Sequence, residues 1–225
     1  MEQTLKDFRE RIAAAAARGA RLQLRGSGSK DWYGQAPRGE RLATGAYHGI
    51  LAYEPSELVI TARCGTPLAE IEAVLAERDQ MLAFEPPHFG PAATVGGMLA
   101  CGLSGPRRQA VGALRDFVLG AALMDGRGET LRFGGQVMKN VAGYDVARLL
   151  AGSLGGLGLI LQASLKVLPR PYCEASVRLA MDQATALRSV NDWAGQPLPI
   201  SASAWHDGAL TLRLSGARAA VRAAR

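Results

Sequence analysis

The feature that most constrains this chain is a pair of glycine-rich segments, residues 134–145 and 152–158. Neither segment can bury a continuous apolar face, so neither is expected to form an ordinary core helix or strand. Glycine lets the main chain adopt left-handed conformations, and it lets backbone N–H groups approach a ligand without a Cβ in the way. The two segments therefore predict backbone held close to a bound cofactor.

The length of 225 residues and the hydrophobic content of 48% fit one large domain with part of a second. The N-terminus carries acidic residues where a secretory signal needs a basic and then an apolar run. The apolar stretches are too short to span a membrane. We expect a cytoplasmic protein that associates at most peripherally with the inner membrane.

The formal net charge of +6 does not by itself indicate nucleic-acid binding. Basic residues are scattered among 20 acidic ones, and no aromatic residues alternate with them to stack bases. Cys64, Cys101 and Cys173 are widely spaced and include no C-x-x-C pair. These patterns predict no nucleic-acid partner, no iron–sulfur or zinc site within the chain, and three reduced thiols.

The first half of the chain alternates helical and strand patterns. Leu5, Phe8 and Ile12 recur at helical spacing, and this helix should stop at Gly19. Thr66 and Pro67 predict the N-cap and the first-turn proline of another helix. The expected elements are an opening helix to residue 17, strands at 21–25, 50–53 and 58–62, and a helix from residue 68.

The second half of the domain has clearer turn signals. Residues 94–100 predict a helix that begins at a glycine-rich turn, and Asp145 can cap a short helix over 146–150. Residues 125–128 predict a turn that joins strands 117–124 and 129–133 as an antiparallel hairpin. A long apolar strand is expected from residue 157 to residue 168.

Pro169 and Pro171 mark the best boundary, between a domain of residues 1–170 and a second unit of residues 171–225. Beyond them the sequence predicts a strand at 176–180, a helix at 182–193 and a hairpin of 200–205 with 209–214. We expect this unit to be truncated, because a short helix and hairpin cannot close a core. Truncation would expose Val177, Leu179, Leu210 and Leu212.

One phosphate-binding candidate follows the strand at 21–25. Residues 26–31 carry Asp31 where a dinucleotide fingerprint needs its third glycine, and the chain contains no Gly-Lys pair for a P-loop. Two interpretations stay open. The segment is either an ordinary glycine turn or a nest whose N–H groups, two hydroxyls and one ammonium bind a pyrophosphate.

Several segments, taken in chain order, resemble a known family. Residues 25–29, 54–59, 94–100 and 152–160 resemble the flavin-binding domain of the vanillyl-alcohol oxidase type, also called PCMH-type. Residues 105–108, 133–145 and 165–171 resemble the second FAD-binding subunits of glycolate oxidase. The resemblance covers residues 20–172 and is specific because the segments occur together.

This resemblance implies an α+β fold in which two subdomains clasp FAD, followed by the start of an α+β cap domain. It assigns the pyrophosphate to Gly26, Ser27, Gly28, Ser29 and Lys30. It also implies that the flavin and its ribityl chain lie near Thr94, Gly96, Gly97 and Ser104, and that main-chain groups around Gly158 and Ile160 meet the adenine end. Some relatives link the flavin to a histidine or cysteine in the first loop. Neither occurs between Arg25 and Asp31, so we expect noncovalent FAD.

The implied function is oxidation of glycolate to glyoxylate by an FAD-binding subunit, with electrons passed to an iron–sulfur partner beside a related flavin subunit. Two alternatives stay open. One is an assembly subunit with a structural FAD, and the other is a dehydrogenase of another 2-hydroxy acid such as lactate.

No catalytic residue can be assigned from the sequence. His88 precedes the helix at 94–100 and is the best placed of the three histidines to line a pocket, or it is a loop residue bonded to backbone. Arg107 and Arg108 either face an acidic substrate or a partner or belong to a solvated loop. Lys139 is open to an anionic ligand, whereas Asn140 and Asp145 favour turn formation. The histidine spacing predicts no metal site.

Overall fold

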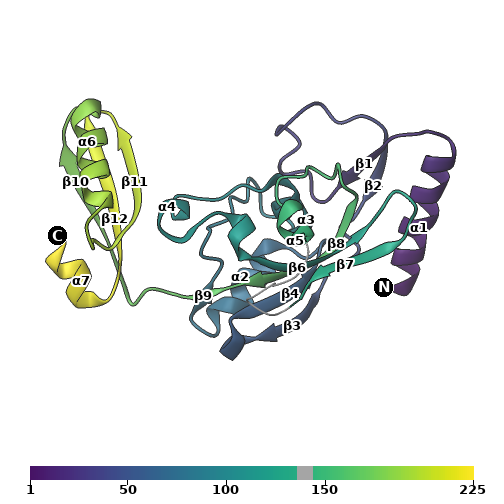
Figure 1. The fold of residues 1–225 in the computed structure, drawn as a ribbon, viewed down its shortest axis with the longest axis horizontal. Coiled ribbons are helices and arrows are strands. Elements are labelled where there is room, and N and C mark those ends of the chain that lie inside the picture. Colours follow the sequence, from purple (N-terminus) through teal and green to yellow (C-terminus); the bar gives the residue numbers. More distant parts are fainter. Residues whose placement is uncertain (136–143) are drawn as a thin grey trace.

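The computed structural model describes residues 1–135 and 144–225, and it shows a larger unit built on one antiparallel sheet (Figure 1). The strand order in this sheet is β3-β4-β8-β6-β7, and each neighbouring pair is antiparallel. Helices and strands are mixed along the chain, so the expected α+β class is confirmed. The strands are β3 (Ile50–Glu54), β4 (Val59–Arg63), β8 (Leu159–Lys166), β6 (Val118–Met124) and β7 (Thr130–Gly134).

Strand β8 lies at the centre of this sheet, and most of its side chains, on both faces, are buried. The hydroxyl oxygens of Thr61 on β4 and Ser164 on β8 lie 2.8 Å apart in the interior, where each satisfies the other. The predicted hairpin of β6 and β7 is also confirmed. In its turn, Asp125 accepts hydrogen bonds from the backbone N–H groups of Arg127 and Glu129.

Helices α2 (Leu68–Ala76), α3 (Val95–Cys101) and α5 (Val146–Leu149) share one hydrophobic core with the sheet. The predicted helix at 68 exists, but the N-cap predicted at Thr66 is wrong. The N-cap position is Pro67, and the Thr66 hydroxyl instead accepts from the Gly49 N–H at 2.8 Å. Pro67 itself is extended, with φ of −60° and ψ of 139°, so the helix begins one residue later than a cap at Thr66 requires and Thr66 lies outside the capping position.

Helix α1 (Glu2–Ala17) buries Phe8, Ile12 and Ala15 on one face, as its sequence predicts. Strand β1 (Leu22–Arg25) then pairs in parallel with β2 (Glu40–Ala43), a strand that the sequence pattern did not reveal. Parallel neighbours cannot be joined by a tight turn. Residues 26–39 must therefore leave β1 and return, and this excursion forms the loop that borders the cavity described below.

The remaining elements of the larger unit are short. They connect the longer elements or lie at the edge of the core. They are η1 (Pro55–Glu57), β5 (Gln80–Met81), α4 (Arg108–Val111), η2 (Leu114–Phe117) and β9 (Leu168–Pro169), of which β5 and β9 pair with each other.

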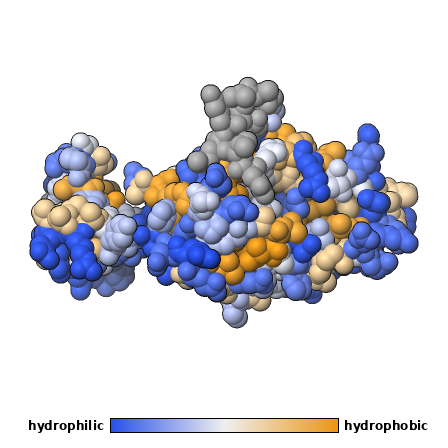
Figure 2. Space-filling model, turned by 90° about the horizontal axis from the view of Figure 1, so that it is seen from below, coloured by the Kyte–Doolittle hydropathy of each residue, from blue (hydrophilic) through white to orange (hydrophobic). Residues whose placement is uncertain are grey.

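A smaller unit follows β9 and lies at the left of Figure 1, beyond an extended stretch of chain. It contains a three-stranded antiparallel sheet in the order β10-β12-β11. Hydrophilic residues cover much of the face of this unit that Figure 2 shows. Its elements are β10 (Cys173–Ala180), α6 (Gln183–Ala194), β11 (Ile200–His206), β12 (Ala209–Gly216) and α7 (Arg218–Ala223).

The smaller unit has a core of its own, which corrects one expectation. Leu210 and Leu212 were predicted to be exposed, yet they are only 2% and 6% exposed. Helix α6 covers them, and Ala186 on this helix belongs to the same buried cluster. Val177 and Leu179 on β10 are half-buried. A single amphipathic helix is thus enough to cover one face of a three-stranded sheet.

Alternating charges join the two units. Arg107 precedes α4, and its guanidinium contacts Glu85 at 3.3 Å and Glu174 on β10 at 2.6 Å. Arg213 on β12 contacts Glu85 at 2.8 Å. The Arg107 side chain is only 7% exposed, so it depends on both carboxylates for compensation of its charge.

Within the described residues, no helix is both long enough and apolar enough to cross a membrane.

Replacing Arg107 with methionine should destabilise the protein, because it leaves the Glu85 and Glu174 carboxylates without the cation between them. We expect a loss of about 1–3 kcal/mol in the free energy of unfolding, below the full cost of breaking a buried pair because both carboxylates are partly exposed. Arg108→Met is the matched control, since Arg108 is exposed and should change the free energy by less than about 0.5 kcal/mol. Urea denaturation of both variants measures the difference. Equal losses would contradict the account.

The same contacts should give an acid-dependent stability. Burial opposes ionisation of Glu85 and Glu174, but hydrogen bonds from Arg213 to Glu85 and from Ser215 and Arg107 to Glu174 hold the pKa of each carboxyl below its ordinary value of 4.5. Their contribution is therefore complete above pH 4.5 and is lost as the pH falls through the lower folded-state values. The difference in unfolding free energy between the wild type and Arg107→Met should shrink below pH 4.5. A difference that stays constant would show that these carboxylates do not carry it.

Candidate functional site

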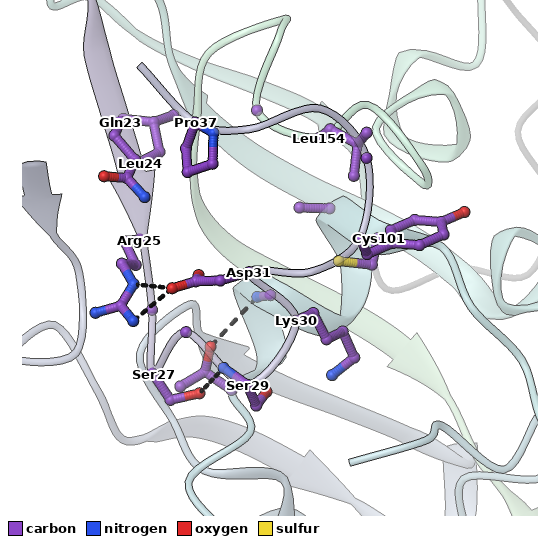
Figure 3. A pocket seen from close by; sticks show the side chains of 18 of the residues that line it. Gln23, Leu24, Arg25, Ser27, Ser29, Lys30, Asp31, Pro37, Cys101 and Leu154 are labelled. Carbon is purple, nitrogen blue, oxygen red and sulfur yellow. Dashed lines mark hydrogen bonds and ion pairs between the residues drawn. The ribbon is translucent and has the colours of Figure 1, made fainter. Parts of the chain in front are cut away.

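A cavity of about 700 Å³ opens beside helix α3 (Figure 3). Three segments border it: β1 with the loop that follows, helix α3, and residues 154–156. Its volume lies within the range of small-molecule and cofactor sites. The cavity is therefore the candidate functional site, and the three segments that form it are separated widely in the sequence.

Helix α3 lies at backbone contact distance from strand β4 and the residues that follow it. The Gly96 N–H donates to the carbonyl of Cys64 at 2.7 Å. A Cβ on Gly96 would lie 2.8 Å from the Cβ of Cys64, closer than side chains pack. The helix begins at Thr94, whose hydroxyl accepts from the Gly97 N–H at 3.3 Å. The predicted helix start is thus confirmed, and its glycines allow the close approach.

The segment 152–158 packs against the other end of α3. The Gly152 N–H donates to Leu99 at 3.0 Å, and the Leu154 N–H donates to Ala100 at 2.9 Å. Leu154 and Gly155 both have positive φ. Backbone hydrogen bonds therefore hold this segment against α3, and residues 154–156 also border the cavity. In the other glycine-rich segment, Gly134 ends β7 with φ of 67°, whereas residues 136–143 lie outside the described residues.

The loop after β1 is held in one shape by two glycines and an ion pair. A Cβ on Gly26 would lie 2.5 Å from the Thr94 hydroxyl oxygen, so this residue lets the loop approach α3. The Arg25 Nε donates to the Asp31 carboxylate at 2.7 Å, and Gly28, with φ of 83°, leaves room for the guanidinium. Figure 3 shows Arg25 and Asp31 pointing toward each other across the loop. The hydrogen bond from Arg25 lowers the pKa of Asp31 and keeps it ionised.

Backbone donors are available in this loop. The N–H groups of Ser27, Gly28 and Lys30 donate to no atom of the described residues. The Ser27 hydroxyl accepts from the Ser29 N–H at 3.4 Å, which closes a small turn. All four residues line the cavity. Successive unpaired N–H groups in a tight turn form a concave site for an anion.

Lys30 adds a cation to the same loop. Its side chain is half-buried and lines the cavity, and no carboxylate lies within ion-pair distance among the residues that the structure describes. The ammonium donates to the carbonyl of His88 at 3.3 Å. Burial lowers the pKa of Lys30. A half-buried ammonium without an anionic partner favours an anionic ligand in the cavity.

A second cavity of about 70 Å³ lies next to the first, since Gly26, Gly97 and Leu154 line both. Gly158 and Ile160, at the start of β8, line this smaller space together with Gly96. The structure thus brings ten of the eleven predicted binding residues to two adjoining cavities. They are Gly26, Ser27, Gly28, Ser29, Lys30, Thr94, Gly96, Gly97, Gly158 and Ile160.

Ser104 is the eleventh predicted residue, and the structure does not bring it to either cavity. Its hydroxyl accepts from the N–H of Leu114 at 2.9 Å and so fixes the chain before η2. A serine three residues beyond the end of a helix has no sequence signal that separates such a backbone bond from a ligand contact.

Two cysteines line the cavities, which no local sequence pattern indicates. Cys101 borders the larger cavity and Cys64 the smaller. Burial raises the pKa of the Cys64 thiol to about 12 and also raises that of Cys101. Both are therefore thiols at neutral pH, which are poor nucleophiles. In the described part of the chain, no three His, Cys, Asp or Glu side chains are grouped as ligands for a metal ion.

Three other residues that the sequence singles out, His88, Arg107 and Asp145, line neither cavity. The His88 ring contacts Glu72 on α2 at 3.0 Å, and it lines neither cavity. Arg107 belongs to the junction between the two units and is buried there, so it is not part of a solvated loop. Asp145 caps α5 by accepting from the Arg148 N–H. Lys139 and Asn140 fall outside the described residues.

Comparisons with known proteins agree with this geometry. The family model described as FAD binding domain matches residues 3–134. The chain is 50% identical over 216 residues to glycolate oxidase subunit GlcE of Escherichia coli (strain K12), a match that covers 96% of the chain and 62% of that relative. It is 35% identical over 122 residues to D-lactate dehydrogenase of Anaerostipes hadrus, covering 54% of the chain and 25% of that relative.

The fold also resembles a solved structure described as alkyldihydroxyacetonephosphate synthase. The TM-score is 0.73 at 17% sequence identity, and the alignment covers 98% of this chain and 47% of that one. An identity this low supports the fold alone. The chain spans less than two thirds of the length of each of these proteins.

Gly96→Ala should destabilise the protein, because the new Cβ would lie 2.8 Å from Cys64 and push α3 away from β4. Overpacking of this kind costs about 1–3 kcal/mol, of which better helix propensity recovers up to about 1 kcal/mol. Gly126→Ala is the control, since a Cβ there meets nothing within 4 Å. Thermal unfolding compares the two variants. Equal melting temperatures would show that α3 does not depend on this contact.

Proposed function

The chain belongs to the FAD-binding domain family, and on that premise we propose that the two cavities beside α3 hold FAD noncovalently. In this proposal the loop residues Gly26, Ser27, Gly28, Ser29 and Lys30 bind the pyrophosphate. The flavin and its ribityl chain lie near Thr94, Gly96 and Gly97, and main-chain groups around Gly158 and Ile160 meet the adenine end.

The observation that carries this proposal is the set of unpaired donors in one loop. The N–H groups of Ser27, Gly28 and Lys30 have no hydrogen-bond partner among the described residues, and the Lys30 ammonium has no carboxylate partner there. All three residues line one cavity. A pyrophosphate carries the negative charge and the acceptor oxygens that these donors lack. The glycines at 26, 96 and 97 fit the same assignment, because they let the loop, α3 and the residues after β4 pack closely around the cavities that they line.

Noncovalent binding is favoured by the state of the thiols. Covalent attachment through cysteine needs a thiolate, and burial keeps Cys64 and Cys101 protonated. His88 is paired with Glu72 and lies outside the cavity lining. The residues that do line the cavities hold the cofactor by hydrogen bonds, charge and packing.

Bound FAD supplies a hydride acceptor for the oxidation of an alcohol. The chain's own residues orient it. The Arg25–Asp31 pair and Gly28 fix the loop. The Thr94 cap and the Gly96 contact fix α3, and residues 154–156 border one side of the cavity. A site held this firmly is preorganised, so little ordering is required when the cofactor binds.

For the substrate, the similarity to glycolate oxidase subunit GlcE supports glycolate, which would be oxidised to glyoxylate. Because GlcE is a subunit of glycolate oxidase, the similarity also supports assembly into a complex. The family resemblance in the sequence implies a related flavin subunit and an iron–sulfur subunit as partners. A second candidate is lactate, because the chain is also similar to D-lactate dehydrogenases. Both are small 2-hydroxy acids.

The absorption spectrum of the purified chain tests the cofactor. We expect bands near ~370 and ~450 nm, typical of oxidised flavin. After acid precipitation they should appear in the supernatant, because the flavin is not linked to the protein. Bands that stay with the pellet would contradict noncovalent binding. A colourless protein that takes up no added FAD would contradict the cofactor assignment itself.

Anaerobic addition of glycolate or D-lactate then separates the functional alternatives. Bleaching by glycolate at a lower concentration than by D-lactate supports the glycolate assignment, and the opposite order supports the lactate alternative. A flavin that neither acid reduces, even with partner subunits added, would indicate a structural cofactor in an assembly subunit.

A further inference from the structure

The segment 86–90 packs beside the loop that follows β1. A Cβ on Gly90 would lie 3.5 Å from the Cβ of Ser29, which is an ordinary packing distance. The His88 carbonyl accepts from the Lys30 ammonium at 3.3 Å. The same ammonium lies 5.9 Å from the centroid of the Phe89 ring, within the range of a cation–π contact. Two neighbouring residues of one segment therefore hold the Lys30 side chain.

The backbone of Phe89 adopts a left-handed conformation, which is unfavourable for a residue with a large side chain. Its φ is 51°, and Gly90 follows with φ of 140°. A residue with a large side chain adopts left-handed backbone only when its surroundings compensate the cost. This conformation brings the carbonyl of His88 and the ring of Phe89 to the same ammonium.

Contacts of His88 and of Glu85, the residue that precedes segment 86–90, anchor this segment. His88 contacts Glu72 on α2 at 3.0 Å. Glu85, which also has positive φ, accepts from the backbone N–H of Arg107 at 2.9 Å. On its outer side, the Phe89 ring meets the Trp32 ring edge-to-face at 5.0 Å. Phe89 is still 53% exposed, so core packing does not explain why an aromatic ring stands there.

We propose that Phe89 is a positioning residue that, together with the His88 carbonyl, holds the Lys30 ammonium in place for the pyrophosphate. This inference rests on the proposed FAD site. A lysine side chain has several rotatable bonds, and ordering it in advance removes an entropic cost from binding. The ring also offers the ammonium a favourable contact that, unlike a carboxylate, does not neutralise its charge. Lys30 thus stays available to an anion.

A double-mutant cycle on the full chain tests this role. FAD is removed and its dissociation constant is measured by titration for the wild type, Phe89→Leu, Lys30→Met and the double variant. Phe89→Leu keeps an apolar side chain but removes the ring face, and it should weaken FAD binding roughly two- to five-fold. Lys30→Met should weaken it roughly ten-fold or more. In the Lys30→Met background, Phe89→Leu should have no further effect.

Two controls separate positioning from a structural role. Phe89→Tyr keeps the ring and should bind FAD like the wild type. Riboflavin lacks phosphate, so neither Phe89→Leu nor Lys30→Met should change its binding. An equal effect of Phe89→Leu with and without Lys30, an equal loss of riboflavin binding, or no effect on FAD would overturn the inference. A wild-type chain that binds no FAD would instead show that the proposed function fails.

Discussion

The hydrogen bond from the Gly96 N–H to the Cys64 carbonyl, at 2.7 Å, fixes the position of helix α3, and the rest of the site depends on that position. Only a residue without a Cβ permits this contact. Once α3 is in place, its first turn meets the loop after β1 at Gly26, and its last turn accepts hydrogen bonds from Gly152 and Leu154. The cavity is the space left between these three segments.

Charge then determines what this cavity is suited to bind. Arg25 is neutralised by Asp31, so it shapes the loop without offering a free charge. Lys30 has no such partner in the described part of the chain, and its ammonium contacts only a carbonyl and an aromatic ring. The two basic residues are five positions apart and have opposite roles. One stabilises the loop, and the other is available to a ligand.

Much of the fold was predictable because local signals were strong. The hairpin of β6 and β7 follows from its turn residues, and α6 from Asp182 and its apolar spacing. Strand β2 was missed because only one of its four residues is buried. The cap predicted at Thr66 was wrong because Pro67 is extended and is not the first helical residue. Within the site, the loop glycines carried a clear signal, whereas Cys101 and the contact of Phe89 with Lys30 depend on tertiary placement that no local pattern encodes.

The most direct test of the account is hydrogen exchange of the loop after β1, measured with and without FAD. The N–H groups of Ser27, Gly28 and Lys30 have no partner in the described structure, so they should exchange rapidly in the free chain. Saturating FAD should protect these three amides strongly, because they donate to the pyrophosphate. If FAD binds and protects other segments while these amides exchange unchanged, the pyrophosphate lies elsewhere and the central claim is wrong.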